Sequence, residues 1–152
     1  MECTVKHFNE LTSVELYEIL QIRAEVFVVE QNCVYQDLDN KDKGAYHVFL
    51  HEDGKVKAYL RVLAAGVSYE DASIGRVLTI QRGTGLGKQL LLEGIKVAKE
   101  KFNADKIRIS AQSYAKGFYE QVGFKQVSEE YLEDGIWHME MLLDSKNNNA
   151  NK

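Results

Sequence analysis

QRGTGLGKQL, residues 81–90, places three glycines at alternate positions between Arg82 and Lys88, directly after the apolar run of residues 74–80. The pattern predicts that a strand ends and a helix begins at this point. Small residues at the start of a helix leave several backbone N–H groups without partners, where the positive end of the helix dipole also points. Glycine has no Cβ to block the approach of a ligand. The stretch therefore predicts a site for a diphosphate, with an ordinary glycine-rich turn as the alternative.

Two familiar phosphate-binding motifs do not fit these glycines. A nucleotide P-loop needs a glycine five residues before its Gly-Lys pair and a Ser or Thr after it, but Arg82 and Gln89 occupy those positions. A dinucleotide fingerprint, G-x-G-x-x-G, would have to end at Lys88 or Leu90. We therefore expect a diphosphate ligand that is bound differently from ATP or NAD.

The composition excludes several classes of protein. The chain has 152 residues, 45% of them hydrophobic and 28% charged, with a formal net charge of -4. These values are typical of a soluble globular domain, and the acidic balance argues against nucleic acid and favours a cationic substrate. The N-terminus lacks an apolar signal region, and no stretch approaches the roughly 18 apolar residues of a membrane span. We therefore expect a cytoplasmic protein with no membrane partner.

The chain offers no boundary between two domains. Without a repeat, a proline or a Gly/Ser-rich linker, residues 1–145 are predicted to form one domain, and the polar KNNNANK, residues 146–152, to form a disordered tail. Cys3 and Cys33 lie in no CxxC motif, which favours plain thiols. His47 and His51 would stand about 13 Å apart on a strand, too far for one ion, so we expect no metal site.

Hydrophobic periodicity and turn residues predict the order of the elements. Thr12 and Glu15 have capping-box spacing at the start of a helix over residues 12–28. The polar segment 29–45 is long for a loop in a compact domain, which is typical of functional loops. The remaining predictions are hairpins turning at Asp53-Gly54 and Asp134-Gly135, a strand over 73–80, a helix over 85–102, a strand over 106–110 and a helix over 114–121.

This order of elements predicts an α+β fold with one mixed, mainly antiparallel twisted sheet flanked by helices. Two motifs on it resemble a known family. Arg82, Gly85 and Gly87 match the R/Q-x-x-G-x-G/A loop of the GNAT acyltransferase superfamily, and AQSYAKGFYEQVGF, residues 111–124, resembles its second signature. More narrowly, residues 23–42 and EDGIWH, residues 133–138, are similar to the ElaA-like branch. The resemblance implies the GNAT fold, which some schemes class as an α/β three-layer sandwich.

The sequence departs from the family pattern at three positions. Gln112 stands where many members have asparagine, which bears on one cofactor contact. Val34 and Trp137 stand where this branch tends to have proline, which bears on local rigidity.

The resemblance also implies which residues hold acetyl-CoA. In the superfamily, the strand before the glycine loop offers backbone N–H groups to the thioester carbonyl, and the loop holds the pyrophosphate. Carried onto this chain, the expected cofactor contacts are Val77, Leu78, Thr79, Ile80, Arg82, Gly83, Thr84, Gly85, Leu86, Gly87, Lys88, Gln112, Ala115 and Tyr119.

Acetyl transfer to an amine needs a proton for the leaving thiolate and a base for the amine. Tyr119 resembles the family's proton donor, and its alternative role is packing in an aromatic helix face. The base has several candidates. The resemblance implies that the segment after Phe27 forms one wall of the acceptor site, which favours Glu30 and His47. The other candidates are Asp37, Asp39, His138 and Glu140.

The sequence therefore predicts an acetyl-CoA-dependent N-acetyltransferase. We expect the acidic residues Asp37, Asp39 and Asp42 to attract a cationic amine acceptor, whether a small molecule or a protein amine. A non-catalytic acyl-CoA-binding module and an acyltransferase with a longer acyl donor are the alternatives. Either a monomer or a homodimer fits the pattern.

Overall fold

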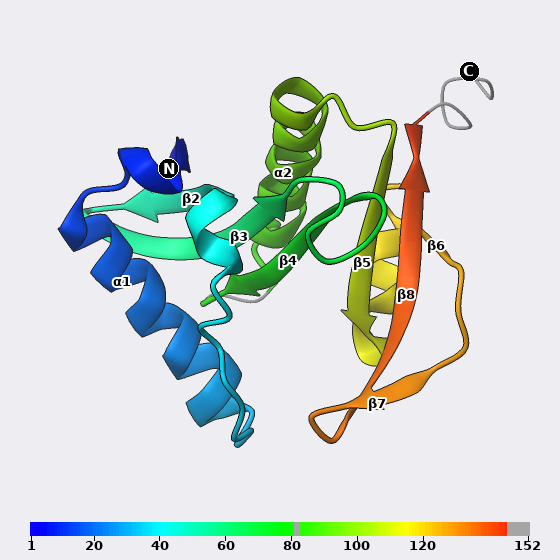
Figure 1. Cartoon of the computed structure of the whole chain (residues 1–152). Helices are drawn as coiled ribbons and strands as arrows, with labels where there is room; N and C mark the ends of the chain where they lie inside the picture. The colour runs from blue at the N-terminus through cyan, green and yellow to red at the C-terminus, as the bar shows by residue number, and fades with distance from the viewer. Residues whose placement is uncertain (81–82, 146–152) are drawn as a thin grey trace.

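The computed structural model describes residues 1–80 and 83–145, which form one mixed sheet with helices on both of its faces (Figure 1). The strand order is β1-β2-β3-β4-β5-β8-β6, and β7 pairs with β8. All neighbouring strands run antiparallel except β4 and β5. The predicted tail at 146–152 lies outside the described residues, and the domain boundary at residue 145 stays a prediction.

The first helix begins where its capping box predicted. In α1 (Ser13–Arg23), Thr12 Oγ1 accepts from the N–H of Glu15, and the Glu15 carboxylate accepts from the N–H of Thr12. The helix then changes its winding, because residues Ala24–Glu30 form a π-helical segment, η2. The long loop that follows contains one 3-10 turn, η3 (Lys41–Gly44).

The predicted meander has one strand more than expected. β2 (Tyr46–Glu52) and β3 (Lys55–Leu63) form the hairpin whose turn uses the positive φ angles of Asp53 and Gly54. β1 (Glu2–His7) pairs along the whole of β2 and was not predicted. A strand at the sheet edge gives a weak signal, since it has one neighbour and little of its side-chain surface is buried.

The second half of the chain follows the predicted order. β4 (Ala72–Thr79) leads through the glycine loop into α2 (Leu86–Phe102), and β5 (Lys106–Gln112) leads through η4 (Ser113–Ala115) into α3 (Lys116–Glu120). The sheet is completed by β6 (Lys125–Gln126), β7 (Tyr131–Glu133) and β8 (Ile136–Asp144). Asp134 and Gly135 have positive φ and turn β7 into β8 as predicted.

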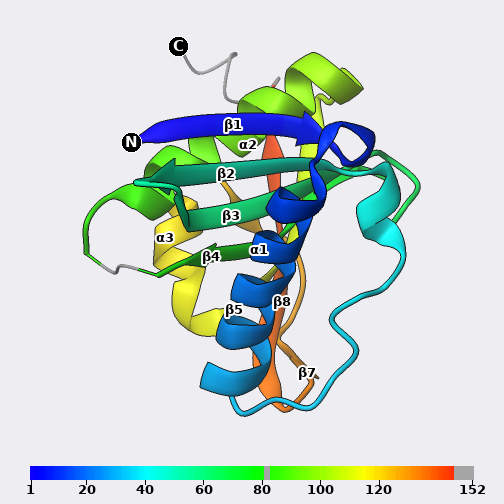
Figure 2. The same cartoon turned by 90° about the vertical axis from the view of Figure 1, so that its left-hand side faces the viewer.

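Helices cover the two faces of the meander, and each face has its own hydrophobic cluster. Figure 2 shows α1 crossing one face of β2, β3 and β4 while α2 lies behind them. Ile19 of α1 packs with Tyr59 and Leu78, whereas the apolar side of α2 packs with Leu60 and Ile74. Alternate residues of the strands thus serve opposite cores, which fixes the register of the sheet.

The parallel pair of strands separates almost at once. β4 and β5 pair at Ala72 with Ile107 and at Ser73 with Arg108, and no further pairing of these two strands is recorded among the described residues. From Ile74 onward the two strands diverge, so the rest of β4 and the rest of β5 form the walls of an opening between the two halves of the sheet.

Candidate active site

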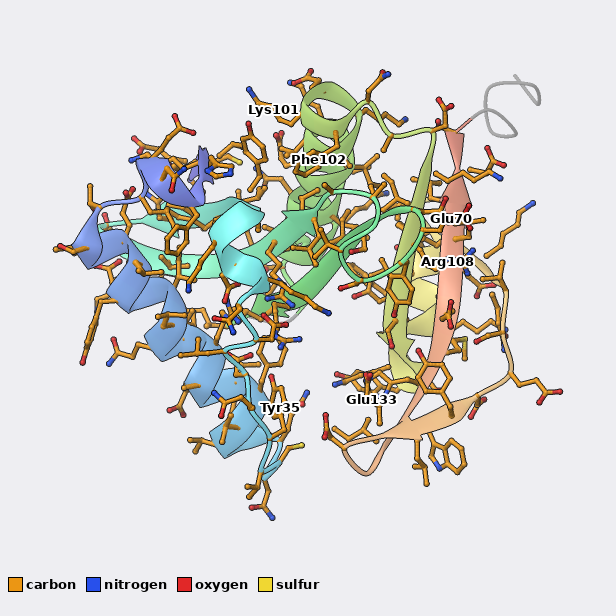
Figure 3. The ribbon with its side chains drawn as sticks, viewed as in Figure 1. Tyr35, Glu70, Lys101, Phe102, Arg108 and Glu133 are labelled. Atoms are coloured by element: carbon orange, nitrogen blue, oxygen red, sulfur yellow. The ribbon has the colours of Figure 1, made fainter. Side chains whose placement is uncertain are left out.

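A cleft of about 1010 Å³ lies where β4 and β5 separate. Its walls come from β4, the first turn of α2, α3, the end of β5, the segment after α1, and the β7–β8 hairpin. Figure 3 shows Tyr35 and Glu133 on facing sides of this opening, and both residues line the cleft. One wall thus belongs to the first half of the chain and the other to the second half.

The first turn of α2 opens into the cleft. Gly85 is its N-cap, with φ +78°, a conformation that residues with a Cβ rarely adopt. Gly85 has no side chain with which to cap this turn, and residues 83–88 line the cleft, so the helix end can bind an anion there. Gly83, Thr84, Leu86 and Lys88 also line the cleft, as expected, while Arg82 lies outside the described residues.

Gly87 has a packing role that was not predicted. It lines the cleft, but its φ is not positive. A Cβ at this position would lie 3.1 Å from Cζ of Phe118 and 3.7 Å from Cγ2 of Thr79. Gly87 therefore allows α2 to approach α3 closely.

A bulge turns the β4 backbone toward the cleft. The β3–β4 register shifts after Tyr59 pairs with Leu78, because Arg76 adopts φ +54° within the strand. Left-handed backbone at a non-glycine residue costs about 1–3 kcal/mol, so the surrounding contacts must hold it. The Arg76 side chain supplies them by donating to the carboxylate of Asp37 at 2.8 Å and to its carbonyl at 2.9 Å.

The bulge decides which β4 amides are available. The N–H of Ile80 donates to the carbonyl of Lys57 on β3, and Ile80 does not line the cleft. Because successive N–H groups of a strand point in opposite directions, those of Val77 and Thr79 point away from β3. The expected contact through Ile80 is therefore wrong, whereas Val77, Leu78 and Thr79 line the cleft.

Tyr119 lies on the cleft from α3. Its side chain is buried, and its ring contacts those of Phe118 and Phe124 edge to face. Burial, with a smaller contribution from the nearby Tyr114, raises the pKa of the Tyr119 phenol well above its ordinary value. The group therefore keeps its proton at neutral pH.

Ala115 and Gln112 border the same space. Both line the cleft, and the amide of Gln112 exchanges two hydrogen bonds of 3.4 Å with the amide of Gln31. Beside them, the thiol of Cys33 donates to the carbonyl of Asp134 at 3.5 Å. The loop after η2 is thus tied to β5 and to the β7–β8 turn. Gln31 was not predicted, since nothing in its sequence context distinguishes it from a surface glutamine.

His47, one of the two favoured bases, lies away from the cleft. It is fully buried on β2, where Nε2 donates to the carbonyl of Asp42 at 3.0 Å and Nδ1 accepts from the hydroxyl of Tyr59 at 2.7 Å. Burial lowers the pKa of His47, despite the opposing effect of the Asp42 carbonyl and charge. With both ring nitrogens occupied inside the core, His47 cannot serve as the base of a reaction in the cleft.

The aspartates of the long loop are paired rather than free. Burial alone would raise the pKa of Asp39, but hydrogen bonds from Arg61 and the charges of Arg61 and Arg76 outweigh it and lower that pKa well below its usual range. The expected attraction of a cation by these residues is wrong, because three arginines neutralise them. The pairs are Asp37 with Arg23 and Arg76, Asp39 with Arg61 and Arg76, and Asp42 with Arg23 and Arg61.

Three other carboxylates border the cleft. Glu30, Glu133 and Asp134 all line it, and no arginine or lysine among the described residues forms an ion pair with any of them. Glu30 was predicted, and it lies exposed at the end of η2. Glu133 and Asp134 were noticed in the sequence as part of the hairpin turn, without a role in the site.

His138 completes the group on the β7–β8 hairpin. Its Nδ1 lies 2.7 Å from the carbonyl of Ile136, and its Nε2 lies 3.5 Å from Oε2 of Glu133. Its ring stacks on that of Tyr131 at 6.2 Å, and the Tyr131 hydroxyl lies 2.5 Å from Oγ of Ser110. Glu140, another predicted candidate for the base, instead forms an ion pair with Arg108 at 3.0 Å.

The arrangement combines the parts that acyl transfer requires. An anion-binding helix end, backbone amides on β4, a protonated phenol and a histidine beside a carboxylate all border one cleft. Among residues 1–80 and 83–145, no helix combines the length and the apolar content needed to cross a membrane.

Comparison with known sequences agrees with this geometry. The family model of the acetyltransferase (GNAT) domain matches residues 10–145. A UPF0039 protein of Schizosaccharomyces pombe is 40% identical over 148 residues, covering 95% of this chain and 97% of the relative. The ElaA protein of Escherichia coli is 37% identical over 139 residues, covering 89% of this chain and 91% of ElaA.

Solved structures confirm the predicted fold. The crystal structure of an acyl-CoA N-acyltransferase from Pseudomonas aeruginosa matches with a TM-score of 0.88 and 39% identity, covering 94% of this chain and 99% of that one. The crystal structure of Escherichia coli ElaA matches with the same TM-score and coverage at 35% identity. The chain therefore belongs to the GNAT acetyltransferase family, in its ElaA-like branch.

Proposed function

We propose that this protein is an acetyl-CoA-dependent N-acetyltransferase that acts on a cationic amine. The observation that carries the proposal is the separation of β4 from β5 after Ser73, with the first turn of α2, whose N-cap is Gly85, opening into the same cleft. Free backbone amides and an anion-binding helix end on one wall suit a ligand with a thioester at one end and a diphosphate at the other. The 39% identity to an acyl-CoA N-acyltransferase supports this donor class.

The donor is proposed to lie along β4. Its diphosphate would contact the backbone of residues 83–88, where the φ of Gly85 turns the chain and Lys88 adds positive charge. The amides of Val77 and Thr79 would donate to the thioester carbonyl, whose oxygen becomes more negative as the acceptor attacks. Gln112 and Ala115 would border the arm between these two ends.

Tyr119 is proposed as the general acid. A departing thiolate is a far stronger base than the thioester, so a phenol that holds its proton at neutral pH can deliver it at this step. A phenol is protonated at neutral pH even without a shift of its pKa, so Tyr119 holds its proton until then.

The acceptor is proposed to be a cation because three carboxylates on the cleft form no ion pair with an arginine or a lysine of the described residues. Glu30, Glu133 and Asp134 come from both walls, so an ammonium entering between them meets negative charge on each side. Asp37, Asp39 and Asp42, which are paired with arginines, have no part in this attraction. The cytoplasmic location and the choice between monomer and homodimer stay predictions of the sequence.

Free CoA release from acetyl-CoA, measured over a panel of amines, tests the proposal. The panel holds a polyamine, an aminoglycoside, a peptide with a free α-amine and a peptide with a lysine side chain. We expect at least one amine to be acetylated, and acetyl-CoA at about 100 times its Kd to stabilise the fold by about 2.7 kcal/mol while ATP and NAD do not. Stabilisation by acetyl-CoA without turnover would favour the non-catalytic acyl-CoA-binding module. Turnover only with a longer acyl-CoA would favour the acyltransferase with a longer acyl donor.

A further inference from the structure

We propose that His138 is the general base of this transfer, with Nε2 as the atom that accepts the proton of the amine and Glu133 as the carboxylate that holds the ammonium beside it. The inference rests on the proposed function, since it assigns a role within that reaction. His138 was one of several candidates in the sequence, and the local geometry singles it out.

The hydrogen bond to Ile136 fixes which nitrogen of His138 is free. A carbonyl oxygen can only accept, so the Nδ1 that lies 2.7 Å from it carries a hydrogen. In the neutral ring, Nε2 then has the lone pair. This second nitrogen is the one directed toward Glu133.

The ring of His138 is held in place from a second side. It stacks on Tyr131 with an angle of 17° between the planes, and the Tyr131 hydroxyl is in turn held by Ser110 of β5. Only 8% of His138 is exposed, yet it borders the cleft. A base must be oriented before the substrate arrives, and two fixed contacts achieve this.

Glu133 favours the proton-accepting role electrostatically. Its Oε2 lies 3.5 Å from Nε2 of His138, and its side chain is 53% exposed, so an ammonium can reach both groups from the cleft. A nearby carboxylate favours the charged form of an imidazole. Glu133 can therefore bind the incoming cation and then stabilise the imidazolium that forms.

The register of the sheet pairs His138 with the residue that precedes the turn and helix of Tyr119, the proposed acid. His138 pairs with Gln112, the last residue of β5, and the turn and helix that follow Gln112 carry Tyr119. Both side chains border the same cleft. Base and acid thus come from adjoining elements, as a transfer between an amine and a thioester requires.

The proton balance of the step is simple. The ammonium gives one proton to Nε2 of His138, and its nitrogen then forms a bond to the acetyl carbon. The C–S bond breaks, and the thiolate takes the proton of Tyr119. The second proton lost by the nitrogen restores Tyr119 through solvent, and His138 releases its own proton to solvent.

The other candidates lack one requirement each. Asp37 and Asp39 are held by arginines, Glu140 is paired with Arg108, and His47 is outside the cleft. Glu30 borders the cleft, but it is exposed and no hydrogen bond recorded for the described residues orients it. Glu30 is therefore the alternative that an experiment must separate from His138.

Charged and titratable groups lie on several of the elements around His138. These are Tyr131 and Glu133 on β7, Asp134 in the turn, Glu140 on β8, Arg108 on β5, Tyr69 in the loop before β4, and Glu30 and Tyr35 across the cleft. Of these, Glu133 is the group within 4 Å of Nε2.

His138→Asn is the sharpest test variant. The asparagine amide can still donate to the Ile136 carbonyl, but it has no atom in place of Nε2. With the fastest amine of the panel, we expect kcat to fall by roughly 10² to 10⁴-fold while the Kd of acetyl-CoA stays the same. The remaining rate of His138→Asn should keep rising with pH over the range in which the wild-type rate is constant. In a second variant, His138→Ala, added imidazole should restore part of the lost rate.

His51→Asn is the matched control, because His51 lies at the far edge of the sheet, where it contacts Thr4 of β1. We expect wild-type kinetics from it. A His138→Asn enzyme with a wild-type rate and pH profile would overturn the proposal. If Glu30→Gln instead removed the fall of the rate at acidic pH, the base would be Glu30.

A measurement without turnover keeps this inference separate from the proposed function. Long-range ¹H–¹⁵N correlation spectra of the full chain report which nitrogen of His138 carries the hydrogen. We expect the Nδ1–H form in the neutral ring. A neutral ring with its hydrogen on Nε2 would overturn the proposal. Failure of every amine to release CoA would instead contradict the proposed function, and with it the role of His138.

Discussion

The side-chain amides of Gln31 and Gln112 face each other across the cleft, each Nε2 lying 3.4 Å from the Oε1 of the other. Gln31 comes from the loop after η2 and Gln112 from the end of β5, so these two weak hydrogen bonds join the walls that β4 and β5 leave apart. Since Gln112 precedes the turn to Tyr119 and pairs with His138, the bridge borders the region where we propose that donor and acceptor meet.

Removal of this bridge should affect the acceptor more than the donor. We expect Gln31→Ala to raise KM for the amine while the Kd of acetyl-CoA is unchanged, because Gln31 follows Glu30 of the proposed acceptor site and is not part of the glycine loop. The loss in stability should not exceed about 1 kcal/mol, the usual contribution of a neutral hydrogen bond. Gln36→Ala, an exposed change in the same loop, serves as the control. A weaker Kd for acetyl-CoA with an unchanged KM for the amine would place Gln31 on the donor side.

The two glycines of the loop should respond differently to valine. Gly85→Val forces a β-branched residue into φ +78°, at a cost of about 1–2 kcal/mol, and should weaken acetyl-CoA binding because the helix end is displaced. Gly87→Val should instead push against Phe118, since even a Cβ would lie 3.1 Å from its ring. Such overpacking typically costs about 1–3 kcal/mol.

A double-mutant cycle with Phe118→Ala separates the two causes. Removing the ring should reduce the cost of Gly87→Val and leave the cost of Gly85→Val as it was, which urea unfolding measures directly. Equal coupling of Phe118 to both glycines would show that Gly85 is also a packing residue.

The buried arginine network should make the fold sensitive to acid. Hydrogen bonds and charges from the arginines outweigh burial and lower the pKa values of Asp39 and Asp42 in the folded state. A lowered folded pKa contributes stability above the unfolded value of about 3.9, and this contribution is lost as the pH falls through the folded value. We therefore expect stability to fall when the pH drops below about 4.

Asp42→Asn tests this network at neutral pH. It leaves the fully buried Arg23 with one charged partner fewer, and breaking a buried pair costs about 3–5 kcal/mol. The variant should also lose less stability than the wild type between neutral and acidic pH, because one titrating group is gone. Asp53→Asn, in the exposed hairpin turn, is the matched control. Equal stability of the two variants would mean that the arginines do not depend on Asp42.

Much of the fold could be predicted because its signals are local. The capping box of Thr12, the Asp-Gly turns and the apolar period of α2 each depend on residues within a few positions of one another. β1 lacks such a signal, because the residues of β2 that pair with it lie about forty to fifty positions further along the chain.

The site was predicted less completely for the same reason. The glycine loop and Tyr119 belong to contiguous motifs and line the cleft. By contrast, the arginines that neutralise the loop aspartates come from α1, β3 and β4, so a local excess of acidic residues gave the wrong expectation of free charge. The prediction of His47 as the base failed for the same reason. Its burial and its two hydrogen bonds, to Tyr59 and to the carbonyl of Asp42, depend on residues that its local sequence does not identify.

The kcat of Tyr119→Phe at saturating acetyl-CoA tests most directly the central claim that this cleft transfers an acetyl group with Tyr119 as the acid. The variant removes one oxygen and keeps the ring contacts with Phe118 and Phe124. The account predicts a fall in kcat of roughly 10² to 10⁴-fold with an unchanged Kd for acetyl-CoA. An unchanged kcat with an amine that the wild type acetylates would contradict it.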